Sequence, residues 1–191
     1  MDVVVEQTQQ RKRIHPHKFT MWVAIGSIIM MFAGLTSAYI VKSNQAGWQS
    51  IVMPKTFWYS TATILLSSVM MQMALRAFKQ RAMNQYRLLI SVTFLLGVGF
   101  VILQGIGFQQ LWNSGVQFKG SSGAGQFLYV IAGLHVLHVF GGVIALMVVF
   151  IKSLFGRVKM YGNTPVQLMS TYWHFVDLLW VYLFVFFMWI Q

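Results

Sequence analysis

Two ionisable residues, His174 and Asp177, lie within the last long apolar stretch of the chain. A carboxylate inside a hydrophobic helix costs about 2.5–3.5 kcal/mol on membrane-insertion scales, so it needs a partner or a function. Their spacing of three places both side chains on one helix face. The pair fits either a proton relay or a buried polar contact that fixes one helix against another. The structural role is favoured, because a single intramembrane carboxylate cannot build a series of relays.

A second candidate group is formed by His135 and His138, which also share one face of an apolar stretch. Haem with two histidine ligands needs them on opposite sides of the ring, so neighbours on one helix cannot both serve. Zinc needs three or four ligands, and no cysteine or carboxylate cluster supplies them. Structural hydrogen bonding is therefore favoured over metal ligation. The same role is expected for Gln104, through a bond between helices.

Other chemistries find little support in the sequence. The chain contains no cysteine, which excludes a disulfide, a thiolate metal site and an iron–sulfur cluster. It contains 13 methionines, and thioethers favour Cu(I), but these residues lie in apolar stretches where methionine commonly fills space. No phosphate-binding loop or nucleophile–base motif is present. We therefore expect no catalytic residue, no cofactor-binding residue and no metal ligand on this chain.

Composition and hydropathy predict an all-α polytopic membrane protein. The 191 residues are 57% hydrophobic and 9% charged, whereas a soluble domain carries about 25% charged residues. Five apolar stretches are each close to the length of about 20 residues that spans a bilayer as a helix. We expect a polar cytoplasmic segment over residues 1–18 and one transmembrane domain over 19–191, with helices at about 19–41, 57–75, 88–111, 127–151 and 170–190.

The connecting segments carry the usual signals of turns. A glycine- and serine-rich stretch over residues 120–125 predicts a flexible loop, and residues 161–165 predict another before the last helix. Small residues four apart let helices approach closely in lipid, and we expect ordinary bundle packing rather than a dedicated dimer motif. These pairs are Ala33 with Ser37, Gly34 with Ala38, and Gly141 with Ala145.

The net charge of +11 comes from basic residues spread over short loops, which argues against a nucleic-acid partner. Under the positive-inside rule, this distribution places the N-terminus in the cytoplasm and the C-terminus outside. The predicted inner side holds Arg11, Lys12, Arg13, Lys18, Arg76, Lys79, Arg81, Arg87, Lys152, Arg157 and Lys159. The outer side holds only Lys42, Lys55 and Lys119.

One family resemblance is carried by the last apolar stretch. The run from Tyr172 to Asp177 (Tyr-Trp-His-Phe-Val-Asp), followed by Trp180, resembles the last-helix signature of subunit III of haem–copper oxidases, the cytochrome c oxidase type. The stretch from His135 to Val139, with Gly142, is similar to the penultimate helix of that family. Weaker similarities are Leu103-Gln104 and Phe32-Ala33-Gly34.

The resemblance covers roughly residues 19–191 and implies the short five-helix form of the family, without the two additional N-terminal helices of the long form. The chain departs from the family pattern at two positions. Family members often carry a glutamate after the serine that corresponds to Ser27, where this chain has Ile28. They often have an acidic residue where this chain has Gly107. Proton-related roles of those carboxylates therefore cannot be transferred.

The function implied by the resemblance is that of a non-redox accessory subunit. It would brace the catalytic subunit I, bind lipid and support proton uptake during oxygen reduction. Haem and copper are expected in partner subunits. The resemblance also implies bound phospholipid, contact with other oxidase subunits and membership of a respiratory supercomplex. His135, His138, His174, Asp177 and Gln104 are carried over as structural or lipid-contact candidates. The expected location is the bacterial inner membrane, ahead of the mitochondrial one.

Several alternatives stay open. Within the family, the chain could be the equivalent subunit of a quinol oxidase or an accessory protein of a nitric-oxide reductase, because the electron donor docks on other subunits. A small transporter or channel would need a path of polar residues or inverted repeats with broken helices. A two-haem membrane cytochrome would need a ligand set that the histidines do not readily provide.

Overall fold

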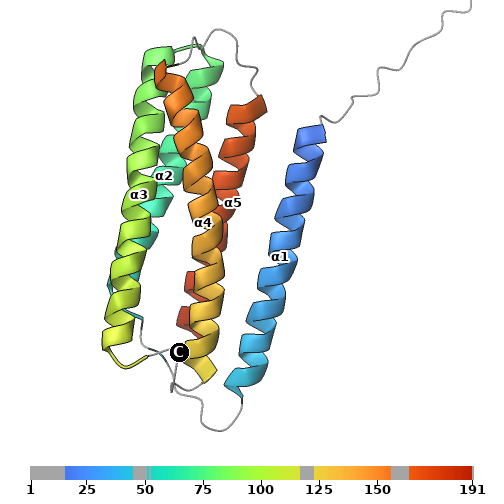
Figure 1. Ribbon diagram of the computed structural model, residues 1–191, viewed down its shortest axis with the longest axis vertical. Helices are drawn as coiled ribbons and strands as arrows, with labels where there is room; N and C mark the ends of the chain where they lie inside the picture. The colour runs from blue at the N-terminus through green and yellow to red at the C-terminus, as the bar shows by residue number, and fades with distance from the viewer. Residues whose placement is uncertain (1–15, 45–50, 52, 117–122, 156–163, 191) are drawn as a thin grey trace, which may run out of the picture.

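The computed structural model describes residues 16–44, 51, 53–116, 123–155 and 164–190, and these form five α-helices (Figure 1). The helices are α1 (Pro16–Ser43), α2 (Thr56–Lys79), α3 (Met83–Asn113), α4 (Gly123–Phe155) and α5 (Thr164–Trp189). All five are long and apolar enough to cross a membrane. The prediction of an all-α, five-span membrane protein is confirmed.

The helices extend beyond most of the apolar stretches from which they were predicted. The loop expected at 120–125 is partly wrong: residues 117–122 lie outside the described part, but α4 already begins at Gly123. Ala124 and Gly125 are buried, so packing stabilises a first turn that composition alone marks as flexible. At the start of α5, Pro165 is the second helical residue, a place where its missing N–H costs no intrahelical bond.

Four of the helices form the main bundle, and α1 lies at its edge (Figure 1). Within the bundle, α2 packs against α3 and α5, and α4 packs against the same two helices. Helix α1 contacts α4 and α5. A three-residue turn joins α2 to α3, with Arg81 in the left-handed conformation (φ 59°) and an N–H···O bond of 3.0 Å from Ala82 to Ala77. The short turn explains why α2 and α3 are antiparallel neighbours.

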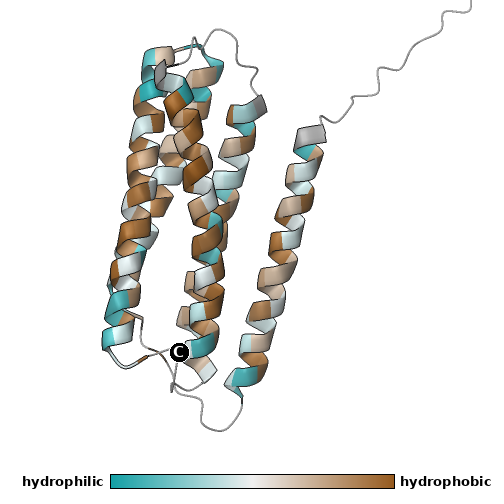
Figure 2. Cartoon of the chain, in the orientation of Figure 1, coloured by the Kyte–Doolittle hydropathy of each residue, from teal (hydrophilic) through white to brown (hydrophobic). Residues whose placement is uncertain are grey.

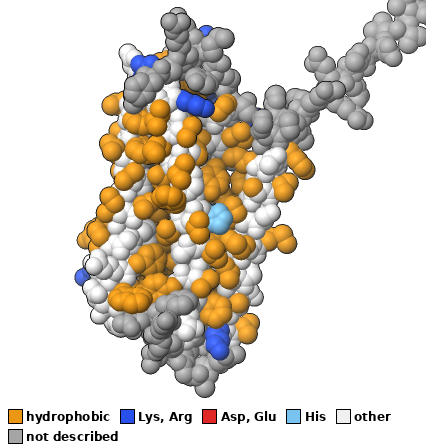
Figure 3. Space-filling model, in the orientation of Figure 1, with side chains coloured by type: hydrophobic (Ala, Val, Ile, Leu, Met, Phe, Trp, Pro, Cys, Tyr) orange, Lys and Arg blue, Asp and Glu red, His pale blue; other side chains and the backbone are white. Residues whose placement is uncertain are grey.

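Hydrophobic residues dominate the length of every helix, and hydrophilic residues gather toward the helix ends (Figure 2). Figure 3 shows that one outer face is covered by hydrophobic side chains, with Lys and Arg toward its two ends. No acidic side chain is visible on this face among the described residues. This distribution fits a molecule whose outside meets lipid rather than water.

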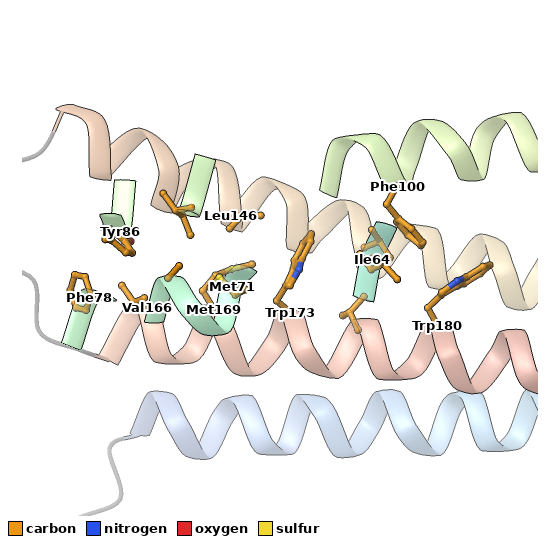
Figure 4. Packing of buried hydrophobic residues seen from close by; sticks show 14 of the residues in the cluster. Ile64, Met71, Phe78, Tyr86, Phe100, Leu146, Val166, Met169, Trp173 and Trp180 are labelled. Atoms are coloured by element: carbon orange, nitrogen blue, oxygen red, sulfur yellow. The ribbon is translucent and has the colours of Figure 1, made fainter. Parts of the chain in front are cut away.

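Two tryptophans of α5 lie at the centre of the packing. Trp173 and Trp180 are each only 1% exposed and belong to the larger hydrophobic cluster of α2, α3, α4 and α5. Figure 4 shows both rings pointing from α5 into the bundle, on the side away from α1. A second cluster, which includes Phe32 and Tyr39, fixes α1 to the N-terminal half of α4 and to the C-terminal half of α5.

Close packing around these rings depends on glycines. A Cβ atom at Gly97 would lie 2.9 Å from Cη2 of Trp173, and one at Gly142 would lie 3.2 Å from Tyr172. By contrast, a Cβ at Gly34 or Gly141 would meet no atom within 4 Å. The expectation that these two glycines serve packing of the bundle is therefore not met within the described part of this chain.

Substitution of Gly97 by alanine tests this packing. We expect Gly97→Ala to lower the free energy of unfolding by about 1–3 kcal/mol, because the added methyl group must displace the Trp173 ring. Gly99→Ala is the matched control on the same helix, since a Cβ there meets nothing within 4 Å. It should be neutral or stabilising by up to about 1 kcal/mol. Thermal unfolding of the two variants in detergent measures the difference, and equal midpoints would contradict the packing argument.

Candidate functional site: polar contacts between α2 and α5

The main set of polar side chains in the membrane-spanning region lies on one side of α2. Residues 60 and 61 are followed seven positions later by residues 67 and 68, which is close to two helical turns, so the four hydroxyls line one side. One further turn brings Gln72 to the same side. We call this set the polar α2 face; it comprises Ser60, Thr61, Ser67, Ser68 and Gln72.

Two hydroxyls of the polar α2 face accept hydrogen bonds from the indole N–H groups of the two buried tryptophans. Trp173 Nε1 donates to Ser67 Oγ at 3.1 Å, and Trp180 Nε1 donates to Thr61 Oγ1 at 3.0 Å. Ser67 in turn donates to the backbone carbonyl of Thr93 on α3, at 3.3 Å. Because a buried indole N–H needs an acceptor, these two bonds fix α5 in register against α2.

His174 reaches the same face through both ring nitrogens. Nδ1 lies 2.6 Å from Ser68 Oγ, and Nε2 lies 3.2 Å from Gln72 Oε1. An amide oxygen can only accept, so with this amide orientation Nε2 carries the proton and Nδ1 accepts from the Ser68 hydroxyl. His174 is half-buried, and Gln72 is exposed. This histidine therefore connects the inside of the bundle with its outer surface.

Asp177 is 3% exposed and lies one turn beyond His174. Neither carboxyl oxygen, however, has a partner that meets hydrogen-bond geometry among the described residues. His174 and Asp177 are thus not bonded to each other; the described partners of His174 are Ser68 and Gln72.

His135 is completely buried, and its ring stacks on Trp180 with centroids 5.2 Å apart. The edge of Phe32 approaches from α1, at 6.4 Å between centroids. Neither ring nitrogen has a hydrogen-bond partner in the described part of the chain. The prediction of a structural hydrogen bond is therefore not matched by a described contact at His135.

Gln104 and His138 do make such bonds. Gln104 Nε2 donates to Ser60 Oγ at 3.1 Å, which joins α3 to the polar α2 face. His138 Nδ1 lies 2.7 Å from the carbonyl oxygen of Leu134, and Tyr172 donates to the carbonyl oxygen of His138 at 3.0 Å. The Gln104 bond joins α3 to α2, whereas the His138 side chain bonds within α4.

A metal or haem fits poorly here. No group of three His, Cys, Asp or Glu side chains that could hold a metal ion occurs among the described residues. The His135 ring lies between Phe32 and Trp180 with 0% exposure, which leaves no room for a porphyrin. His138 is also unsuited as its partner, because the two rings come from one helix.

Sequence analysis missed the polar α2 face. A signal was present, since Ser60, Thr61, Ser67 and Ser68 recur with a spacing of seven in an otherwise apolar span. Single hydroxyls are common in membrane helices, so only the position of their partners reveals their role. Those partners, Trp173 and Trp180, are themselves seven residues apart on α5.

Comparison with known proteins identifies the family of the chain. The family model of cytochrome c oxidase subunit III matches residues 15–191. The chain belongs to the cytochrome c oxidase subunit III family. A probable cytochrome c oxidase subunit 3 of Nocardia farcinica is 31% identical over 184 residues, covering 91% of this chain and 90% of the relative. Cytochrome c oxidase subunit 3 of Bacillus sp. (strain PS3) is 29% identical over 168 residues, covering 85% and 80%.

The two positions that depart from the family pattern have a local explanation. A Cβ at Gly107 would lie 3.0 Å from Phe57 Cζ, so any side chain there, acidic or not, would displace this buried ring. Ile28 packs against the second hydrophobic cluster, where a carboxylate would lack a polar partner. In this member of the subunit III family, apolar contacts occupy both places.

The contact between Thr61 and Trp180 can be tested by removing the hydroxyl. We expect Thr61→Val to lower the free energy of unfolding by about 0.6 kcal/mol and by no more than about 1.7 kcal/mol, the mean and the maximum measured for hydrogen bonds between membrane helices. Thr63→Val is the control, because that hydroxyl bonds only to the carbonyl of Tyr59 on its own helix. Thermal unfolding gives the stability, and the NMR shift of the Trp180 indole proton reports the bond. An unchanged indole shift in Thr61→Val would show that the bond does not form.

Proposed function

We propose that the chain is the non-redox accessory subunit III of a bacterial haem–copper terminal oxidase and that it braces the catalytic subunit in the inner membrane. The observation that carries the proposal is the match of the family model to residues 15–191. The family implies a multi-subunit oxidase, and the names of the relatives assign them to such a complex. In this proposal, haem and copper reside on partner subunits.

The distribution of polar groups supports a bracing role. Within the described spans, several polar side chains bond inside the bundle: Ser67 and Thr61 hold the tryptophans, and Gln104 binds Ser60. The helices are therefore fixed against one another, while large apolar side chains cover the outside. An apolar exterior suits packing against another membrane subunit and against lipid, and large apolar side chains of this kind do not line a polar path for a transported solute.

The basic side chains support an N-terminus in the cytoplasm. Lys18, Arg76, Lys79, Arg81, Arg87 and Lys152 lie at the end of the bundle where α1 and α5 begin, whereas Lys42 and Lys55 lie at the opposite end. The positive-inside rule assigns the first end to the cytoplasm. The other basic residues used for the sequence prediction lie outside the described residues. On this cytoplasmic side, anionic lipid headgroups would find favourable charge.

Support of proton uptake completes the proposal. In an oxidase whose catalytic subunit takes up protons from the cytoplasm, a bound subunit III would keep the uptake pathway intact through many turnovers. The chain would act through contact with the catalytic subunit.

Purification through a tag on this chain tests the assembly. In mild detergent, the tagged chain should bring with it a subunit that carries haem and copper, identified by mass spectrometry and by the reduced-minus-oxidised spectrum. The same chain, expressed alone, should show no haem band. Recovery of no haem–copper subunit, or a haem band from the isolated chain, would contradict the proposal.

Deletion of the chain tests its support of turnover. An oxidase without this subunit should keep its haem spectrum and its initial rate of oxygen consumption but lose activity progressively during continuous turnover. Re-expression of the intact chain is the control and should restore a constant rate. A deletion strain with unchanged activity over time would rule out the supporting role while leaving the assembly untouched.

A further inference from the structure

One polar side chain departs from the apolar exterior of the bundle: Gln72 on α2. It is exposed, and it lies about 10 Å along the helix from Lys79, the last residue of α2. Exposed hydroxyls elsewhere in the spans, such as those of Ser27 and Thr171, donate to the carbonyl oxygen four residues earlier in their own helix. The Gln72 side chain makes no such bond among the described residues, so α2 alone does not satisfy it.

The contact of Gln72 with His174 leaves two donors unused. Gln72 Oε1 accepts from Nε2 of His174, at 3.2 Å, but the amide nitrogen carries two N–H groups for which no partner is described. In hydrocarbon neither lipid tails nor water accept from these groups, and glutamine in membrane spans commonly bonds across helices. The free donors therefore favour a protein acceptor from outside this chain.

The residues around Gln72 form a continuous face on the outside of α2 and α5. On α2, Leu65 and Val69 are 48% and 55% exposed, and both lie within about 60° of Gln72 around the helix axis. On α5, Leu178 lies one turn beyond the histidine that binds Gln72 and is 70% exposed. The exposed Arg76 follows Gln72 by one turn and adds a positive charge nearer the end of α2. We call this set the outer α2–α5 patch; it comprises Leu65, Val69, Gln72, Arg76, His174 and Leu178.

We propose that the outer α2–α5 patch binds a transmembrane helix of the catalytic oxidase subunit. The partner helix presents a hydrogen-bond acceptor, such as an amide or hydroxyl oxygen, opposite Gln72 and an acidic side chain opposite Arg76. Because Gln72 and Arg76 are four residues apart, the two partner groups are separated by about 6 Å along the helix. This inference rests on the proposed function, to which it adds the face of contact and the chemistry of the partner.

Charge argues against a second copy of this chain as the occupant. Two copies with the same orientation in the membrane would bring Arg76 against Arg76. Among the described residues the only acid is Asp177, which is 3% exposed and therefore cannot pair with an arginine of a neighbour. A lipid phosphate would pair with Arg76, but lipid tails would leave the Gln72 N–H groups without an acceptor. A protein helix with the two stated groups satisfies both residues.

Photo-cross-linking in membranes tests the face of contact. Leu65 in the patch and Leu95 on α3 are replaced, in turn, by a photoactivatable diazirine amino acid. Leu95 is the matched control, because it is also a leucine, is 67% exposed, and lies at a similar distance from the same end of the bundle. We expect an adduct with the haem–copper subunit from position 65 and adducts with lipid alone from position 95.

Competition for the oxidase tests the hydrogen bond of Gln72. In Gln72→Met the side chain keeps a similar length but loses the amide. The variant and the wild-type chain carry different tags and are co-expressed with the oxidase. We expect the share of the variant in the haem-containing fraction to fall about three- to tenfold below that of wild type, the effect of one hydrogen bond between membrane helices.

Controls separate loss of contact from loss of folding. Thr63→Val removes a hydroxyl that bonds only within α2, so it should compete equally with wild type. Thermal unfolding of the isolated Gln72→Met chain should have a midpoint close to that of wild type, because the residue is exposed. Arg76→Gln should also lower the share, and less so at high salt, because salt screens an exposed ion pair.

The outcomes distinguish this inference from the proposed function. Adducts of position 65 with lipid alone or with a second copy of this chain would overturn the patch as the contact face. Equal shares of Gln72→Met and wild type would also overturn it, and in both cases the assembly itself would stand. Failure of either tag to recover a haem–copper subunit would refute the proposed function and this inference with it.

Discussion

The structure depends on the need to satisfy two indole N–H groups inside a bilayer. Trp173 and Trp180 fill the centre of the bundle, and in hydrocarbon no water is available to accept from their nitrogens. Ser67 and Thr61 supply the acceptors, at 3.1 and 3.0 Å. Burial of the rings and bonding of their nitrogens therefore demand the same register of α5 against α2, and a slip of one residue would lose both.

The remaining helices follow from this central pair. Close approach of α3 to the Trp173 ring requires Gly97, where a Cβ would lie 2.9 Å from the ring, and a Cβ at Gly142 on α4 would crowd Tyr172 at 3.2 Å. Helix α1 lies outside this arrangement and is held by ring contacts such as those of Tyr39 with Phe186 and Phe187. One hydroxyl pair, Thr36 and Tyr182 at 3.0 Å, adds a polar contact to α5. Four helices thus form a specified core, and α1 is an apolar addition to it.

The sequence predicts the fold well and the site only in part. Five apolar stretches identify five spans, because helix is the only structure that a single segment can adopt in lipid. The residues His174 and Asp177 stand out for a similar reason, since their polarity is costly at that depth. The polar α2 face does not stand out, because serine and threonine are tolerated in membrane helices by bonding to their own backbone. Thr63 does so, while Thr61 also serves Trp180. Nor does residue type separate Gly97, which meets a tryptophan, from Gly34, which meets nothing.

The adjacent hydroxyls Ser67 and Ser68 of α2 point to different partners. Ser67 is committed to Trp173 and to the carbonyl of Thr93, so its proton and its acceptor site are both occupied by contacts that hold the helices. Ser68, one residue later, lies 2.6 Å from Nδ1 of His174 instead. A rotation of 100° between successive helical residues is enough to separate the two tasks. Neighbouring hydroxyls of one helix thus bind Trp173 and His174, two successive side chains of α5.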